Sequence, residues 1–178
     1  MSAGEHHPPE RAAGPPTRTP ICQSFLAKLA RTPDKARRLS IFKACAKVRA
    51  PWVEELFWES LGDSCETVRA FIFRELAARP TLDLARAFDR LERPPWYARS
   101  AVIGLFGIHR ATEAMPHIGR AVEATTNVEV RRAAAGALGE IGGKEALALL
   151  VRLKKDPSPY VRQAAEEAIR KASDVRFT

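Results

Sequence analysis

The chain has 178 residues, of which 46% are apolar, and a formal net charge of +8. This length suits one domain or a short array of repeats, and the apolar share is enough to build a core. No apolar run approaches the ~20 residues of a membrane-spanning helix, and the first twenty residues lack the apolar stretch of a signal peptide. A membrane protein and an exported protein are therefore not expected. Leu and Ala dominate over β-branched residues, which favours helices over strands.

The positive charge is concentrated at the front of the chain. Residues 1–50 carry ten Lys or Arg and three Asp or Glu, whereas residues 51–125 carry nine and eleven. A strongly basic front can solvate the end of a domain or attract an acidic partner.

Residues 1–19 are predicted to form a disordered, Pro-rich tail, because they contain almost nothing to bury. The folded domain is then expected to occupy residues 20–178. His6 and His7 lie side by side in the tail, but two ligands on an unfolded segment make a poor metal site. Neither a metal site nor a cofactor site is predicted.

The cysteines Cys22, Cys45 and Cys65 are three in number, and no CxxC motif occurs. An odd count without an export signal indicates reduced thiols that pack as small apolar groups. We therefore expect a cytoplasmic protein.

Two kinds of helix are predicted to alternate along the chain. Helices of the first kind are expected near residues 20–31, 51–61, 81–92, 112–124 and 144–155. Helices of the second kind have related sequences and contain residues 37–45, 68–76, 98–106, 130–138 and 161–169. Their apolar residues recur on one face at 100° per residue.

The second kind of helix carries an arginine at the same place in every copy, with steps of 30 to 32 residues. The arginines are Arg38, Arg69, Arg99, Arg131 and Arg162. A residue repeated in each unit is expected to serve the stacking of the units. We interpret the series as a structural ladder, in which each guanidinium bonds an acidic cap or a helix-end carbonyl of an adjoining repeat, such as Asp63 or Asp156. The other interpretation is a row of anion-binding groups.

Start and stop signals surround these helices. Predicted starts are the capping boxes Asp63 with Glu66 and Thr126 with Glu129, and the pairs Thr32-Pro33 and Ser158-Pro159. Predicted breaks are Gly62 and Gly142-Gly143. The run of small residues at 133–137 predicts that another helix backbone approaches at Gly136, since close packing must offset the low helix propensity of glycine.

The pattern resembles the HEAT-like repeats first associated with phycobilin lyases, in which a D-x-x-V-R-x-x-A-A-x-A-L-G-x-I-G consensus recurs about every 31 residues. The match is strong over residues 126–173, fair over 93–125 and weak over 20–92. The resemblance implies an all-α fold, an α-solenoid of antiparallel helix pairs with about four to five repeats in a HEAT-like superhelix. It also implies that the repeats provide binding surfaces.

No catalytic residues are predicted. Deoxyhypusine hydroxylase is an iron enzyme with such repeats and His-Glu pairs near its helix starts, but this chain has Arg132-Ala133 and Gln163-Ala164 there. No P-loop, GxGxxG or GxSxG motif occurs. His109 and His117 have no acid or nucleophile aimed at them in the pattern. The chain is therefore predicted not to be an enzyme.

Two features of the front half break the repeat pattern. Glu75 stands where the other copies carry apolar residues, and an ion pair with Arg38 or Arg99 is expected in preference to a catalytic role. The aromatic residues Trp52, Phe57, Trp58, Trp96 and Tyr97 are expected to lie mostly in the core, with an exposed subset available to a partner.

A basic patch surrounds one helix of the front end. It consists of Arg31, Lys35, Arg37, Lys43, Lys47 and Arg49. The predicted function is a non-catalytic scaffold or regulatory adaptor that binds another protein. The alternative is a nucleic-acid-binding module, because the HEAT-like DNA alkylation-repeat proteins hold duplex DNA in a basic groove. The net acidic residues 51–125 argue against that alternative.

Overall fold

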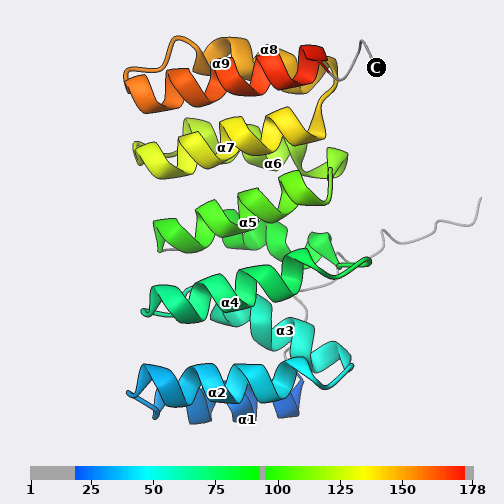
Figure 1. The fold of residues 1–178 in the computed structure, drawn as a ribbon, viewed down its shortest axis with the longest axis vertical. Coiled ribbons are helices and arrows are strands. Elements are labelled where there is room, and N and C mark those ends of the chain that lie inside the picture. The colour runs from blue at the N-terminus through cyan, green and yellow to red at the C-terminus, as the bar shows by residue number, and fades with distance from the viewer. Residues whose placement is uncertain (1–18, 93–94, 175–178) are drawn as a thin grey trace, which may run out of the picture.

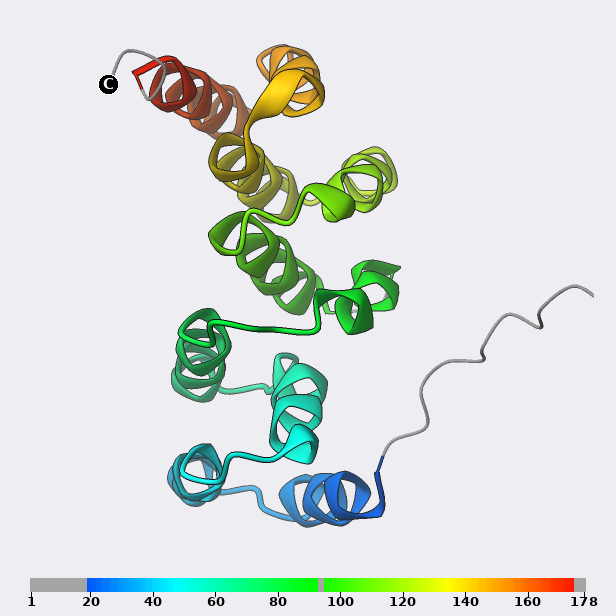
Figure 2. The ribbon, with the colours of Figure 1, turned by 90° about the vertical axis from the view of Figure 1, so that its right-hand side faces the viewer.

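The computed structural model describes residues 19–92 and 95–174, and these form one elongated stack of helices. The chain climbs from α1 at one end to α9 at the other (Figure 1). Seen from the side, the helices make two layers (Figure 2). One layer holds α2, α4, α5, α7 and α9, which carry the arginines, and the other holds α1, α3, η1, α6 and α8. The predicted all-α solenoid of helix pairs is confirmed.

The bounds of the elements follow the predicted alternation. The arginine-bearing helices are α2 (Lys35–Ala46), α4 (Glu66–Ala77), α5 (Trp96–Ile108), α7 (Val128–Ile141) and α9 (Pro159–Asp174). The other layer contains α1 (Pro20–Ala30), α3 (Pro51–Ser60), the 3-10 helix η1 (Leu84–Glu92), the short 3-10 turn η2 (Thr112–Ala114), α6 (Met115–Glu123) and α8 (Gly143–Leu153). The helices expected at 81–92 and 112–124 are therefore a 3-10 helix and a 3-10 turn followed by an α-helix.

Several helices start one or two residues away from the predicted caps. The Asn127 side chain accepts a hydrogen bond from the Val130 backbone N–H at 3.1 Å, so Asn127 caps α7 in place of Thr126. Asp34 caps α2 in place of Thr32. Several neighbouring residues could serve as the N-cap at these two helix starts. The residue that does so is the one with an extended backbone directly before the first helical residue.

Thr19 is the last residue of the predicted tail and the first residue that the structure describes. Thr19 caps α1, and its backbone N–H and hydroxyl both donate to the buried carboxylate of Glu55, at 3.0 and 2.9 Å. This bond ties the start of the domain to α3. The rest of the predicted tail, with His6 and His7, lies outside the described residues.

The later helices of the arginine layer pack backbone to backbone. A Cβ atom at Gly107 of α5 would lie 2.7 Å from the Cα atom of Ala137 on α7. One repeat later, a Cβ at Gly139 of α7 would lie 2.8 Å from the Cβ of Ala168 on α9. Such distances leave no room for a side chain, so glycine permits the close approach of α5, α7 and α9. Packing between α4 and α5 is much sparser.

The close contact predicted at Gly136 is wrong. Gly136 is exposed, and nothing lies within 4 Å of the place where its Cβ would be. Gly136 and Gly139 are three residues apart on one helix, and only Gly139 faces the next repeat.

Aromatic side chains fill the front half of the stack. Phe42, Phe57 and Phe71 come from three successive helices, and their rings meet edge to face with centroids 6.0 and 6.5 Å apart. Trp58 is also buried, whereas Trp96 stays 44% exposed at the start of α5. Aromatic rings thus fill the space between helices in the front half, whereas in the later repeats small residues let the helices approach and leave little space to fill.

None of the helices in the described residues is long and apolar enough to cross a membrane.

Candidate interaction surfaces

Two arginines of the ladder each form a bidentate ion pair with an aspartate of the following repeat. Arg38 donates from Nε and a terminal nitrogen to the two carboxylate oxygens of Asp63, both at 2.9 Å. Arg131 does the same to Asp156, at 2.8 and 3.2 Å. These are the two acids named from the sequence. Such bidentate pairs hold neighbouring repeats in one register, and Asp63 raises the pKa of Arg38.

The ladder arginines also bond the backbone ahead of their own helix. Arg69 donates to the carbonyls of Asp63 and Ser64 at 2.7 and 3.0 Å. Arg162 donates to the carbonyl of Asp156 at 2.8 Å. A carbonyl in the turn between the two helices of a pair therefore accepts a hydrogen bond from the arginine in the first turn of the second helix. Arg69 also lies 4.1 Å from the centre of the Tyr97 ring.

Arg99 departs from the series. Its Nε atom is buried and has no hydrogen-bond partner, and no ion pair joins Arg99 to any described residue. The expected pair between Arg99 and Glu75 is absent, and Arg38 is already bound to Asp63. Glu75 is partly exposed on α4 and forms no ion pair or hydrogen bond with the described residues.

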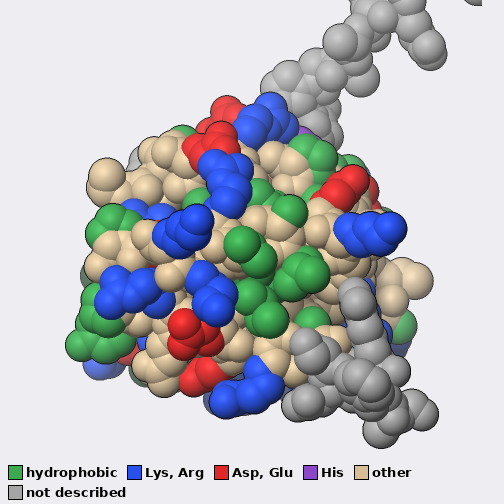
Figure 3. Space-filling model, turned by 90° about the horizontal axis from the view of Figure 1, so that it is seen from above, with side chains coloured by type: hydrophobic (Ala, Val, Ile, Leu, Met, Phe, Trp, Pro, Cys, Tyr) green, Lys and Arg blue, Asp and Glu red, His purple; other side chains and the backbone are tan. Residues whose placement is uncertain are grey.

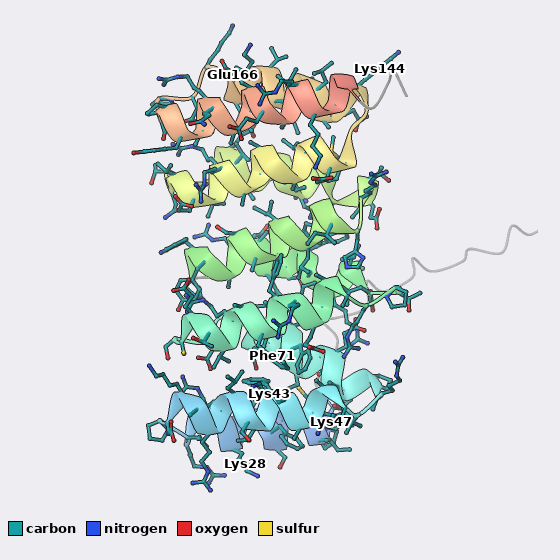
Figure 4. The ribbon with its side chains drawn as sticks, viewed as in Figure 1. Lys28, Lys43, Lys47, Phe71, Lys144 and Glu166 are labelled. Carbon is teal, nitrogen blue, oxygen red and sulfur yellow. The ribbon has the colours of Figure 1, made fainter. Side chains whose placement is uncertain are left out.

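The six residues of the basic patch all lie on the surface of the front end, on α2 and the turns beside it. Arg31 donates to the carbonyl of Ala27 at 3.2 Å. The other five make no hydrogen bond or ion pair with the described residues. Figure 4 shows Lys43 on α2 and Lys47 just past the end of α2, with Lys28 of α1 below them.

An apolar surface covers part of the opposite end of the stack. Leu147 and Val151 of α8 are 38% and 48% exposed. Both lie about 160° around the helix from Leu149, which packs 3.9 Å from the place of a Cβ on Gly119 of α6, so both point away from the preceding repeat. Figure 3 views this end and shows hydrophobic side chains gathered inside a rim of Lys and Arg. We call Leu147 and Val151 the end surface.

The neighbouring helix α9 presents a polar face at the same end. The position that holds Gly107 on α5 and Gly139 on α7 is held by Arg170 on α9, and Arg170 is exposed. Glu166 of α9 and Lys144 of α8 also point outward here (Figure 4). In the described residues, α9 therefore presents a charged residue where α5 and α7 present glycine, while α8 leaves apolar side chains uncovered.

The histidines and cysteines are dispersed. The His117 ring stacks on Phe88 at 4.0 Å, and burial followed by the charge of Arg120 lowers the pKa of His117. Burial raises the pKa of the Cys45 thiol, and the backbone N–H of Val68 lowers that of Cys65. No group of three or more His, Cys, Asp or Glu side chains suited to a metal occurs in the described residues.

Comparison with known proteins identifies the repeats. Residues 84–170 match the family of HEAT repeats. The chain is also similar to a solved structure, the complex of CpcE and CpcF of phycocyanin lyase from Nostoc sp. PCC7120, with a TM-score of 0.59 and 21% identity over 97% of this chain and 71% of that chain. No curated protein matches the chain. Residues 84–170 are HEAT-like repeats, as the spacing of the arginines and glycines predicted.

One functional prediction needs correction. The lack of a catalytic motif in the sequence predicts that the chain is not an enzyme. The similar solved structure belongs to a phycocyanin lyase, so this architecture occurs in an enzyme complex and the exclusion is wrong. The missing motifs carried little weight, because HEAT-like repeats have no fixed catalytic sequence to search for. At 21% identity the likeness to this structure establishes the fold and no more.

Proposed function

We propose that this HEAT-like repeat protein is a binding subunit of a protein complex, and that it receives its partner on the end surface. The observation that carries the proposal is the uncovered apolar face of α8. In α6, the position equivalent to Leu147 is Met115, which is only 6% exposed, whereas Leu147 is 38% exposed. An apolar helix face of a partner would cover Leu147 and Val151 in the same way.

The solved relative supports an assembly of this kind. It is a complex of two different subunits, CpcE and CpcF. The rim around the end surface includes both signs of charge, Lys144 on α8 and Glu166 on α9 (Figure 4). A polar rim around an apolar centre is the usual anatomy of a protein interface.

The test compares partner capture by three tagged proteins in extracts of the native cell. The parent and the control Ile21→Asp, which makes the same kind of change at an exposed site on α1, should retain the same partner. The double variant Leu147→Asp/Val151→Asp should lose it while keeping the parent's circular dichroism spectrum and Tm. Equal capture by all three proteins would refute the end surface. Sedimentation velocity of the purified chain shows whether the partner is a second copy.

A second candidate function is nucleic-acid binding at the basic patch, favoured by the exposure of all six residues and by the lack of carboxylate partners. If about four phosphates are contacted, affinity for an oligonucleotide should fall with salt with a log–log slope of about −3 to −4. We expect only weak binding near physiological salt, because residues 51–125 are net acidic. Fluorescence anisotropy with duplex and single-stranded oligonucleotides decides this. Tight binding that Lys43→Glu/Lys47→Glu abolishes would favour this candidate over the first.

A further inference from the structure

The pocket between η1, α5 and α6 holds the one ladder arginine whose buried Nε atom has no partner in the described residues. This pocket has a volume of ≈ 650 Å³. Its polar lining includes Arg99, Arg120 and His117, and its apolar lining includes Phe88 and Leu91. It lies on the long side of the stack, away from the end surface.

The missing partner of Arg99 is explained by one residue. Asp63 and Asp156 share two local bonds: a carboxylate oxygen accepts from the backbone N–H two residues later, and the carbonyl accepts from the next ladder arginine. Thr125 makes both bonds as well, since its hydroxyl accepts from Asn127 N–H at 3.2 Å and its carbonyl accepts from Arg131 at 3.1 Å. Thr125 therefore occupies the place of the acid in the repeat that follows Arg99.

A hydroxyl in this place caps the turn but supplies no negative charge. In the repeats that have the acid, Nε of the arginine is one of the two atoms that grip it, at 2.9 Å in Arg38 and 2.8 Å in Arg131. The same atom of Arg99 is buried without a partner. An unsatisfied charged donor of this kind favours an anion that reproduces the carboxylate geometry.

The surroundings of Arg99 define the rest of the ligand. Arg120 adds a second positive charge, and the only hydrogen bond of its guanidinium in the described residues is to His117 Nδ1 at 3.1 Å. Of the two acids in the lining, Glu123 is bound to Arg152 at 2.8 Å and Glu92 is exposed. The stacked rings of Phe88 and His117 supply the aromatic part of the lining.

We propose that this pocket binds a carboxylate carried on an apolar or aromatic stem, with the carboxylate on Arg99 and the stem against Phe88. The same chemistry is offered by a free carboxylic acid and by a Glu or Asp side chain of a bound peptide. The ligand takes the place that Asp63 and Asp156 fill in the other repeats.

The test follows the side-chain N–H signals of Arg99 and Arg131 by NMR during titration with phenylacetate. The Arg99 signal should shift, and the Arg131 signal should stay still because Asp156 already occupies that arginine. The variant Arg99→Gln should weaken binding by about tenfold or more, the effect of losing a charge-assisted bond.

The most informative variant places an aspartate at position 125, where the other repeats have Asp63 and Asp156. Thr125→Asp should raise the Tm and weaken phenylacetate binding by about tenfold or more, because the new carboxylate occupies Arg99. Thr125→Asn is the matched control, since it keeps the turn cap without the charge and should bind as the parent does. A parent whose Arg99 signal never moves, or a Thr125→Asp variant that binds equally well, overturns the proposal. So does an Arg99 signal that is already shifted in the free protein and returns in Glu92→Gln, since the pocket is then self-occupied.

The two sources of the carboxylate are separated by a second pair of probes. N-acetyl-Phe-Glu-amide is compared with phenylacetate, and N-acetyl-Phe-Gln-amide is the uncharged control. Tighter binding of the glutamyl peptide assigns the site to a protein ligand, and tighter binding of the free acid assigns it to a small molecule. Equal binding of the Glu and Gln peptides, with no binding of phenylacetate, overturns the carboxylate site. The readout is independent of the end surface, so the two proposals fail separately.

Discussion

The two halves of the stack solve the same packing problem in opposite ways. Between α2, α3 and α4, the phenyl rings of Phe42, Phe57 and Phe71 fill the space between helices. Between α5, α7 and α9, Gly107 and Gly139 remove that space by letting backbones touch Ala137 and Ala168. The two halves should therefore fail under opposite substitutions, the front when a side chain is removed and the back when one is added.

The largest expected effect is a cavity in the front half. Phe57 is fully buried between two other rings, so Phe57→Ala should lower the free energy of unfolding by about 3–5 kcal/mol. Urea denaturation measures the change. Trp96→Ala, at a ring that is 44% exposed, is the control and should cost much less. Equal losses in the two variants would mean that the rings of the front half are not its core.

The matching test of the back half adds a side chain. Gly139→Leu should destabilise the protein by about 3 kcal/mol, because the new Cβ meets Ala168 at 2.8 Å. Gly136→Leu is the control on the same helix, and it should be neutral or stabilise by up to about 1 kcal/mol through better helix propensity. Thermal melts of both variants check the register of α7. A reversed order of Tm values would contradict the packing described for Gly139.

A third test compares two arginines of the ladder. Arg131→Ala should cost about 1.5–3 kcal/mol, because it leaves the buried carboxylate of Asp156 without its partner. Arg99→Ala should cost much less, because Arg99 pairs with no described acid. Denaturation of the two variants, measured without carboxylate buffers, gives the difference. Similar losses would show that the guanidinium stabilises the stack by packing alone.

The smallest expected effect is chemical and concerns the cysteines, all of which lie in the front half. Cys65 is partly exposed with a lowered pKa, and Cys45 is buried with a raised pKa. As pH rises, the thiolate of Cys65 forms first, so iodoacetamide should modify Cys65 at a lower pH than Cys45. Mass spectrometry of peptides after brief labelling locates the modified site. Faster labelling of Cys45 would indicate that the front half opens readily.

The repeat itself was predictable from the sequence, because the arginines recur every 30 to 32 residues and this spacing can be seen without knowing the packing. The pairs of Arg38 with Asp63 and of Arg131 with Asp156 followed from charge and spacing. The close contact was misplaced at Gly136 because two glycines three residues apart lie on adjoining faces, and small residues surround both. Only the packed structure decides which of the two faces the next helix.

The candidate sites were less predictable, because each depends on what a neighbouring repeat leaves uncovered. The Arg99 pocket requires knowing that Thr125, and not Ala124, stands in the place of Asp156, and the step of 32 residues between Arg99 and Arg131 hides this correspondence. The end surface likewise depends on the absence of a covering helix above Leu147 in the described residues. The bond between Thr19 and Glu55 has no sequence signal beyond an acid within an apolar helix.

Arg170 of α9 stands at the position that is glycine in α5 and α7, and it affects how copies of the protein can meet. Stacking one molecule on top of another would continue the arginine layer, and the guanidinium of Arg170 would then have to enter a contact that elsewhere excludes even a methyl group. An uncompensated charge in such a contact is strongly unfavourable. Head-to-tail repetition, which turns repeat arrays into open-ended fibres, is thereby blocked in this layer. The apolar side chains of α8 and the charged position of α9 thus lie at the same end of the stack.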